Sequence, residues 1–236
     1  MKPRVTSACF ILALFAAAPA FACQGRPIVW DIQLGASLKD LPGGFTDHAC
    51  GSNGGPPGRL IAGFAAFKEC KPDSEGLYEV AFRYDDEPEF VARALEQTRA
   101  VAMCEGTKVF GFPVVPSVLL DDEGIVRGLR LATDPRGIEP ADRSNHWALG
   151  NLLKRRYGEN GWVCEDLPEI PGETPVARFK LKEVCTKLLL DGANLTIQSE
   201  YYHRAGQSFT DEFGNVQPNL FVSQTWFEIK QTPGSK

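Results

Sequence analysis

The sequence predicts an α+β protein made of antiparallel sheets with few helices and cross-linked by disulfides. Three observations support this. Several segments alternate apolar and polar residues, which is the pattern of half-buried strands. Only residues 140–157 have a strong helical stripe of apolar residues. Six cysteines remain once an N-terminal leader is set aside, and an even number suits paired sulfurs.

Residues 1–22 have the three parts of a secretory signal peptide. Lys2 and Arg4 precede an apolar run, and the segment ends in a small-x-small cleavage pattern. The apolar run is shorter than the roughly 20 residues that span a bilayer. We therefore expect cleavage near Ala22 and Cys23, and a mature protein that is periplasmic or secreted.

The cysteines are expected to form disulfides because an exported chain meets an oxidising compartment. With Cys9 in the leader, the candidates are Cys23, Cys50, Cys70, Cys104, Cys164 and Cys185. Closeness along the chain favours Cys50–Cys70 and Cys164–Cys185, which leaves Cys23–Cys104. The sequence alone permits other pairings of the six.

Cys23 has an alternative role as the acylated cysteine of a lipoprotein, because it follows the expected cleavage site directly. Residues 20–22, Ala-Phe-Ala, fit the usual Leu-Ala-Gly pattern poorly. Lipidation would also leave one unpaired thiol among the remaining cysteines. We favour a soluble exported form over a lipid anchor at Cys23.

Two modules of similar style are expected, and the first covers residues 23–135. In chain order it should contain a strand at 28–34, a helical turn at 37–41, paired strands at 60–67 and 77–84, a helix at 89–99, and a hairpin of 114–120 with 125–132. Ser37 is a good N-cap for the helical turn. Pro113 and Pro116 place the first hairpin strand at a sheet edge or a bulge.

The second module, residues 136–236, should be a helix followed by an antiparallel meander. We expect the helix at 140–157 and strands at 176–190, 195–202 and 221–229, with turns at 191–192 and 211–214. Leu149 and Leu153 belong to the apolar stripe of the helix, and Gly158 suits its end. Asp191-Gly192 is a strong hairpin signal.

One segment resembles known binding modules. Residues 33–37 read Gln-Leu-Gly-Ala-Ser, and helical turns and antiparallel strands that meet at acidic Asp/Glu-Gly turns follow them. This pattern resembles the small periplasmic α+β modules of the β-lactamase-inhibitor-protein type and of the outer-membrane-assembly lipoprotein BamE. Those modules bind other proteins, so the resemblance implies a binding protein. The cysteine number and the long loops depart from the pattern, and no binding residue is carried over.

Motifs for catalysis, metals and cofactors are missing from the sequence. Cys50 near His48 has the composition of a nucleophile and its base, but a disulfide partner is at hand for Cys50. There is no Cys-x-x-Cys, His-Glu-x-x-His, Gly-x-Ser-x-Gly, phosphate-binding or dinucleotide-binding motif. The acidic run at 85–89 lacks the spacing of a calcium loop. We expect no catalytic residue, no metal and no cofactor.

The overall charge narrows the partners. The 25 Lys and Arg and 30 Asp and Glu residues give a net charge of −5, which offers no support for a nucleic-acid partner. No apolar run after the leader is long enough for a transmembrane helix. Trp147 lies off the apolar stripe of the 140–157 helix and is the candidate partner contact, with packing against the sheet as the alternative.

The function that we expect is therefore an exported, non-catalytic protein that binds another protein or serves in the cell envelope. Two alternatives remain. One is a secreted hydrolase whose carboxylates are dispersed along the sequence. The other is a protein that binds a small ligand or a metal ion.

Overall fold

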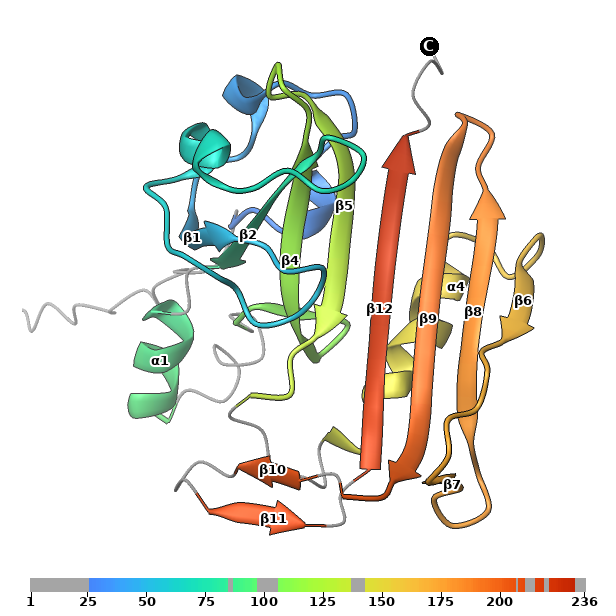
Figure 1. Ribbon diagram of the computed structural model, residues 1–236. Helices are drawn as coiled ribbons and strands as arrows, with labels where there is room; N and C mark the ends of the chain where they lie inside the picture. Colours follow the sequence, from blue (N-terminus) through green and yellow to red (C-terminus); the bar gives the residue numbers. More distant parts are fainter. Residues whose placement is uncertain are drawn as a thin grey trace, which may run out of the picture.

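One large antiparallel sheet dominates the computed structural model, which describes residues 26–84, 87–96, 106–136, 143–206, 208–210, 215–218 and 221–231 (Figure 1). Its strands are β1 (Phe45–Cys50), β2 (Tyr78–Tyr84), β3 (Lys108–Val109), β4 (Phe112–Leu120), β5 (Val126–Thr133), β6 (Val163–Asp166), β7 (Glu173–Thr174), β8 (Leu181–Leu188), β9 (Ala193–Arg204) and β12 (Phe221–Gln231). The order across the sheet is β1-β2-β4-β5-β12-β9-β8-β6, while β3 pairs with β4 and β7 with β9. A separate pair is formed by β10 (Ser208–Thr210) and β11 (Val216–Pro218).

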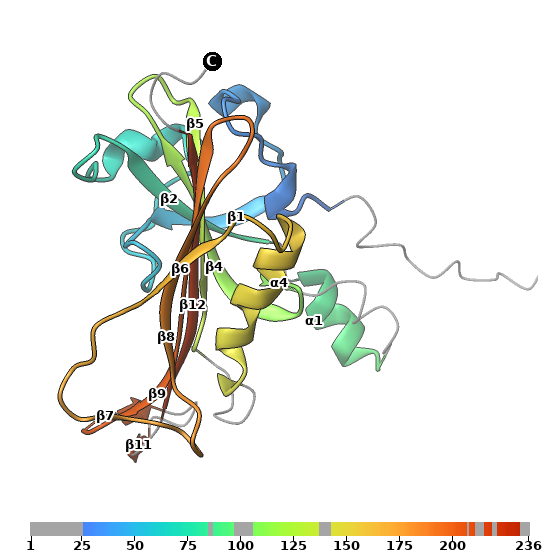
Figure 2. The ribbon, with the colours of Figure 1, turned by 90° about the vertical axis from the view of Figure 1, so that its right-hand side faces the viewer.

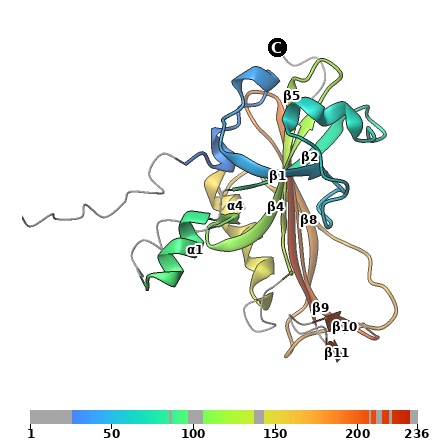
Figure 3. The same cartoon turned by 90° about the vertical axis from the view of Figure 1, so that its left-hand side faces the viewer.

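Helical elements are short and flank the sheet. They are α1 (Glu87–Ala94), α4 (Leu149–Arg156) and the 3-10 turns η1 (Val29–Asp31), η2 (Leu38–Asp40), η3 (Phe64–Glu69) and η4 (His146–Ala148). The two α-helices lie on one side of the sheet and η3 lies on the other (Figure 2, Figure 3). Within the described residues, no helix is both long enough and apolar enough to cross a membrane.

Helix α4 packs closely on β9 and β12. Leu149 and Leu153 from its predicted stripe are fully buried. Gly150 lets the helix approach the sheet, since a Cβ there would lie 2.3 Å from Oγ of Ser199. The core includes the residues between α4 and the strands β9 and β12, and it continues along the sheet through residues of β2, β4 and β5 such as Val80, Val118 and Leu129.

The predicted α+β class with antiparallel strands is confirmed, and several elements lie where the pattern placed them. These are β2, the β4–β5 hairpin, β9, β12 and the turn η2, in which Oγ of Ser37 accepts a hydrogen bond from the N–H of Lys39 at 3.2 Å. The strand expected at 176–190 is shorter, since β8 spans Leu181–Leu188 and Val176 makes only an isolated bridge to Phe179. The helix expected at 89–99 forms α1, which ends at Ala94, and residues 97–99 lie outside the described residues. The turn expected at 211–214 lies outside the described residues.

The strand expected at 28–34 is wrong, because this segment forms η1. Side chains accept hydrogen bonds from its backbone. The N–H of Ile28 donates to Oδ2 of Asp31, and the N–H of Val29 donates to the hydroxyl of Tyr84, both at 2.8 Å. Such bonds compete with a strand ladder.

The strand expected at 60–67 is also wrong. Leu60 makes only an isolated bridge to Ala49, and η3 begins at Phe64. The strand that pairs with β2 is β1, which the sequence pattern did not indicate. Asp47 has a positive φ of 48°, and the register shifts between Thr46 and Ala49, so this bulge breaks the alternation that would reveal a strand.

The helix expected at 140–157 is interrupted. Residues 140–142 lie outside the described residues, Arg143 is helical, a turn and η4 follow at 144–148, and α4 begins at Leu149. The hydroxyl of Thr225 on β12 lies 2.8 Å from the carbonyl oxygen of His146 and accepts from the N–H of Gly150. The hydroxyl of Thr225 therefore takes the place of the backbone hydrogen bond from Gly150 to His146 that a continuous α-helix would contain.

The two halves of the chain share the one sheet. The first half supplies β1 to β5 and the second supplies β6 to β9 and β12, and β5 pairs with β12 from Ala132↔Trp226 to Gly128↔Lys230. The described residues give no support for two repeated modules.

Candidate functional site

The described residues contain two disulfides, Cys50–Cys70 and Cys164–Cys185, and both are pairs that closeness in sequence favours. The first removes Cys50 as a nucleophile, since its sulfur is bonded. Cys23 and Cys104 lie outside the described residues.

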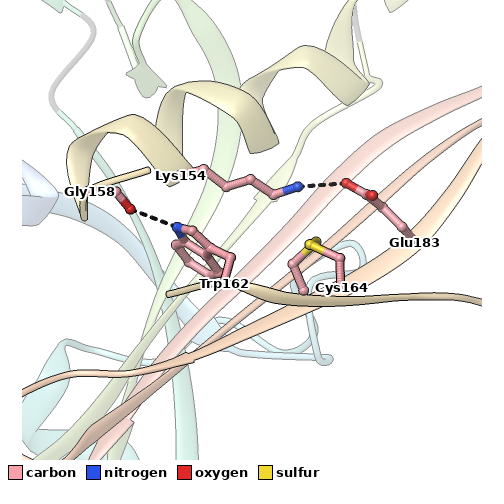
Figure 4. Close-up of a disulfide and its surroundings, with 6 residues drawn as sticks. Lys154, Gly158, Trp162, Cys164 and Glu183 are labelled. Carbon is pink, nitrogen blue, oxygen red and sulfur yellow. Dashed lines mark hydrogen bonds and ion pairs between the residues drawn. A yellow bond between two sulfur atoms is a disulfide. The ribbon is translucent and has the colours of Figure 1, made fainter. Parts of the chain in front are cut away.

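The second disulfide joins β6 to β8 at directly opposed residues and faces α4 (Figure 4). Beside it Lys154 binds Glu183 at 2.7 Å, and Nε1 of Trp162 donates to the carbonyl oxygen of Gly158 at 2.9 Å. Cys164, Glu183 and Cys185 form the one cluster of metal-ligating types in the described chain. It offers no thiolate, because both sulfurs are in the disulfide, and its carboxylate is paired.

Trp147 packs in an aromatic cluster on the α4 side of the sheet. Its ring centroid lies 5.1 Å from that of Phe179 and 6.0 Å from that of Tyr201. Its backbone N–H donates to Oγ of Ser223. This is the packing alternative that the sequence left open, and contact between Trp147 and a partner stays a prediction.

The acidic turn at 121–124 has a structural role. Asp121 accepts hydrogen bonds from the N–H groups of Glu123 and Ile125 and from the guanidinium of Arg127. Burial acts to raise the pKa of Asp121, but these bonds outweigh it and hold the pKa below its usual value. Such a carboxylate stabilises the turn and is a poor acid catalyst.

A cavity opens where β2 and β4 separate. Their ladder runs from Tyr78↔Leu120 to Ala81↔Ser117 and stops there. The next residue on β4 is Pro116, which has no N–H to donate. Beyond that point β2 pairs with β1 and β4 pairs with β5, so a groove of about 910 Å³ lies between them.

The groove has an apolar lining and a charged rim. The two separating strands contribute Phe82, Val114 and Val115. The loop after β1 contributes Leu60 and α1 contributes Phe90, and each of these two residues is 73% exposed. The charged lining residues are Asp47, Arg83, Glu89, Lys108, Asp134 and Arg136.

A short segment before β4 bridges the two strands at one end of the groove. The N–H of Tyr84 donates to Oγ1 of Thr107 at 3.1 Å, and the N–H of Val114 donates to the carbonyl oxygen of Thr107 at 3.0 Å. Glu89 of α1 accepts from the N–H of Gly106 and lies 3.8 Å from Nζ of Lys108. The same segment thus holds α1 beside the groove.

A second cavity of about 480 Å³ lies on the face opposite α4, beneath the glycine-rich loop after β1. Glu79 anchors this loop by accepting from the N–H of Asn53 at 2.8 Å, and it also binds Ser117 and Arg130 at 2.7 and 2.6 Å. The cavity is lined by Ser52, Asn53, Gly54, Gly55, Ala132, Thr133, Gln198, Gln224, Thr225 and Trp226.

Sequence reasoning missed both cavities. The glycine- and proline-rich run at 51–58 indicates turns but no cavity, and the residues that meet beneath it come from the loop, β5, β9 and β12. Pro116 is the local signal of the groove, although the sequence predicts from Pro113 and Pro116 a sheet edge or a bulge. β4 instead lies between β2 and β5, and its ladder with β2 ends at Ser117, next to Pro116.

Comparisons with known proteins give no further identification. No protein-family model matches the chain, and neither does a curated protein or a solved structure.

Proposed function

We propose that this is an exported, non-catalytic binding protein, and that the groove between β2 and β4 holds an extended apolar segment of another protein. The observation that carries the proposal is the early end of the β2–β4 ladder at Ala81↔Ser117. Between this point and the bridge through Thr107 at Tyr84 and Val114, the two strands leave a gap for a short stretch of a third chain.

The lining of the groove supports an extended apolar segment. Phe82 and Val114 are buried beneath it, and Leu60 and Phe90 expose apolar surface that a partner would cover. Recognition along a strand edge combines main-chain hydrogen bonds with pockets for alternate side chains. Rim charges of both signs would set the direction and register of the bound segment.

The carboxylates of the groove support binding rather than hydrolysis. Glu89 is tied to Gly106 and lies near Lys108, and Asp134 binds the guanidinium of Arg136 at 2.7 Å. These two carboxylates serve the structure, whereas a glycoside hydrolase of the usual kind needs two that face one substrate.

Export is supported by the two disulfides together with the leader pattern of residues 1–22. Structural disulfides persist in oxidising compartments and are rare in the cytosol.

The test is a selection of linear peptides on the mature, oxidised protein, followed by affinity measurements on single variants. We expect the selected peptides to be apolar and extended. Leu60→Asp and Phe90→Asp should each weaken binding by about tenfold, because a charge would enter an apolar contact. Both side chains are exposed, so the fold should survive the change.

Leu190→Asp is the matched control, because Leu190 is fully exposed and lies far from the groove in the turn between β8 and β9. An affinity for the peptide that is unchanged in both Leu60→Asp and Phe90→Asp would contradict the proposed site. Turnover of an ester, peptide or glycoside by the wild type would instead favour the hydrolase.

A further inference from the structure

The cavity beneath the glycine-rich loop is a built site with a fixed roof. The N–H of Gly51 donates to the carbonyl oxygen of Glu79, and the N–H of Asn53 donates to its carboxylate, both at 2.8 Å. Gly54 lies so close to the indole of Trp226 that a Cβ would stand 2.6 Å from Cδ1. The roof therefore rests on Trp226, and the loop and the sheet define the cavity together.

Two glutamines on its floor are oriented by one carboxylate. Nε2 of Gln198 and Nε2 of Gln224 donate to the two oxygens of Glu200, each at 2.7 Å. Glu200 is only 6% exposed. An amide that gives its nitrogen to a carboxylate offers its oxygen as a hydrogen-bond acceptor. Gln198 and Gln224 both line the cavity, so it contains two oriented acceptors.

Trp226 adds a donor that has no acceptor. Its Nε1 is buried, and within the described part of the chain it finds no hydrogen-bond partner. A buried N–H without an acceptor is costly, so native proteins usually satisfy it. Gly54 packs against this edge of the indole, so an acceptor brought by a ligand reaches Nε1 only when Gly54, which lies beyond the anchored Asn53, shifts away from Trp226.

The charged groups around the cavity already have partners. Arg130 binds Glu79 at 2.6 Å and Glu228 at 2.5 Å. Glu200 is occupied by the two glutamine amides. The site therefore presents an aromatic side chain, amide acceptors and an N–H donor, and no unpaired cation that would select an anion.

We propose that this cavity binds a neutral saccharide unit. A hydroxyl group both donates and accepts, so hydroxyls on one ring can donate to the oxygens of Gln198 and Gln224 and accept from Nε1 of Trp226. The C–H groups of the same ring suit the apolar indole. The volume of about 480 Å³ falls in the range of small-ligand pockets.

The test uses the mature, oxidised chain and ligand-detected saturation-transfer NMR with glucose, galactose, mannose, N-acetylglucosamine, maltose and cellobiose. At least one should bind saturably. Trp226→Phe keeps an aromatic ring but removes the N–H, and Gln224→Met removes an amide acceptor from an exposed side chain. Each should weaken the binding by about tenfold.

Trp162→Phe is the matched control, since Trp162 lies on the α4 side of the sheet and its Nε1 already has an acceptor. It should leave saccharide affinity unchanged. Peptide binding at the β2–β4 groove should be unaffected by Gln224→Met, which separates this site from the proposed function. Three results would overturn the proposal. The first is that no sugar of the panel binds saturably. The second is that neither Trp226→Phe nor Gln224→Met changes the affinity, and the third is that glucuronate or ethylamine binds more tightly than every neutral sugar.

Discussion

At the scale of single residues, Arg130 joins the two halves of the protein. It lies on β5 with its side chain 8% exposed, and it binds Glu79 of β2 and Glu228 of β12. A buried charge is tolerated only when it is paired and hydrogen-bonded, so these three side chains depend on one another. The same network positions the loop above Trp226, since Glu79 also holds Asn53.

His48 gives a residue-level prediction about pH. Burial lowers its pKa below the usual 6.5, and attraction to Asp47 opposes this only in part. Its ring contacts the edge of Phe64 at 4.5 Å between centroids. The unfolded chain therefore takes up a proton on His48 more readily than the folded protein. The resulting stability is present above pH 6.5 and is lost as the pH falls below it towards the folded pKa.

We expect NMR titration to give His48 a pKa below 6.5. Urea unfolding at about pH 7.5 and about pH 5.5 should show a smaller loss of stability in His48→Gln than in the wild type. His203→Gln controls for the removal of a histidine elsewhere in the sheet. A folded pKa at or above 6.5, or the same loss of stability in His48→Gln, would show that burial does not control this group.

At the scale of elements, the sequence predicts best those strands that bury one face. β2, β9 and β12 alternate over most of their length. The core contains apolar residues of their predicted inward faces, namely Val80, Phe82, Tyr84, Leu195, Ile197, Phe227 and Ile229. The sequence did not predict β1, because its bulge at Asp47 breaks the alternation. The start of α4 was not predicted for another reason. The hydroxyl of Thr225 bonds to the backbone there, and Thr225 is more than seventy residues away in sequence. A local pattern carries no information about such a partner.

The edge strand β6 gives an element-level prediction. All four of its residues are exposed, so little apolar burial holds it, and Cys164–Cys185 ties it to β8. Cys164→Ala with Cys185→Ala should lower the free energy of unfolding by about 3 kcal/mol. Amide exchange in β6 should accelerate while β9 and β12 stay protected.

Urea unfolding and amide exchange measured by mass spectrometry check this expectation. Val163→Ala is the control within the same strand, because it keeps the disulfide and changes a side chain that is 63% exposed. Undiminished protection of β6 in the double variant would mean that the ladder with β8 holds the strand alone.

At the scale of the whole molecule, the sequence predicts the class and the cross-links better than the sites. The alternation and the helical stripe indicate an antiparallel α+β protein, and closeness in sequence favours the two disulfides that form. The cavities could not be predicted, because Gln198, Gln224 and Trp226 meet the loop only after β5 pairs with β12. Periodicity assigns residues to faces, but it does not say which strands become neighbours.

The groove and the cavity beneath the glycine-rich loop also arise from different features of the fold. The groove exists because β2 and β4 stop pairing, with α1 and the loop at Leu60 on opposite sides of the sheet (Figure 3). The cavity exists because a loop anchored by Glu79 covers an otherwise open face. One site is a gap in the sheet and the other is a covered part of its surface. Both border the loop after β1, but they share no lining residue, so a substitution in the lining of one leaves the lining residues of the other in place.

The central claim is that the gap between β2 and β4 receives an extended segment, and amide hydrogen exchange with and without a selected peptide tests it most directly. We predict that the peptide adds protection in β2 at residues 82–84, in β4 at residues 114–115 and around Leu60, and leaves β8 and β9 unchanged. Protection gained only in β8 and β9, with none along the gap, would contradict it.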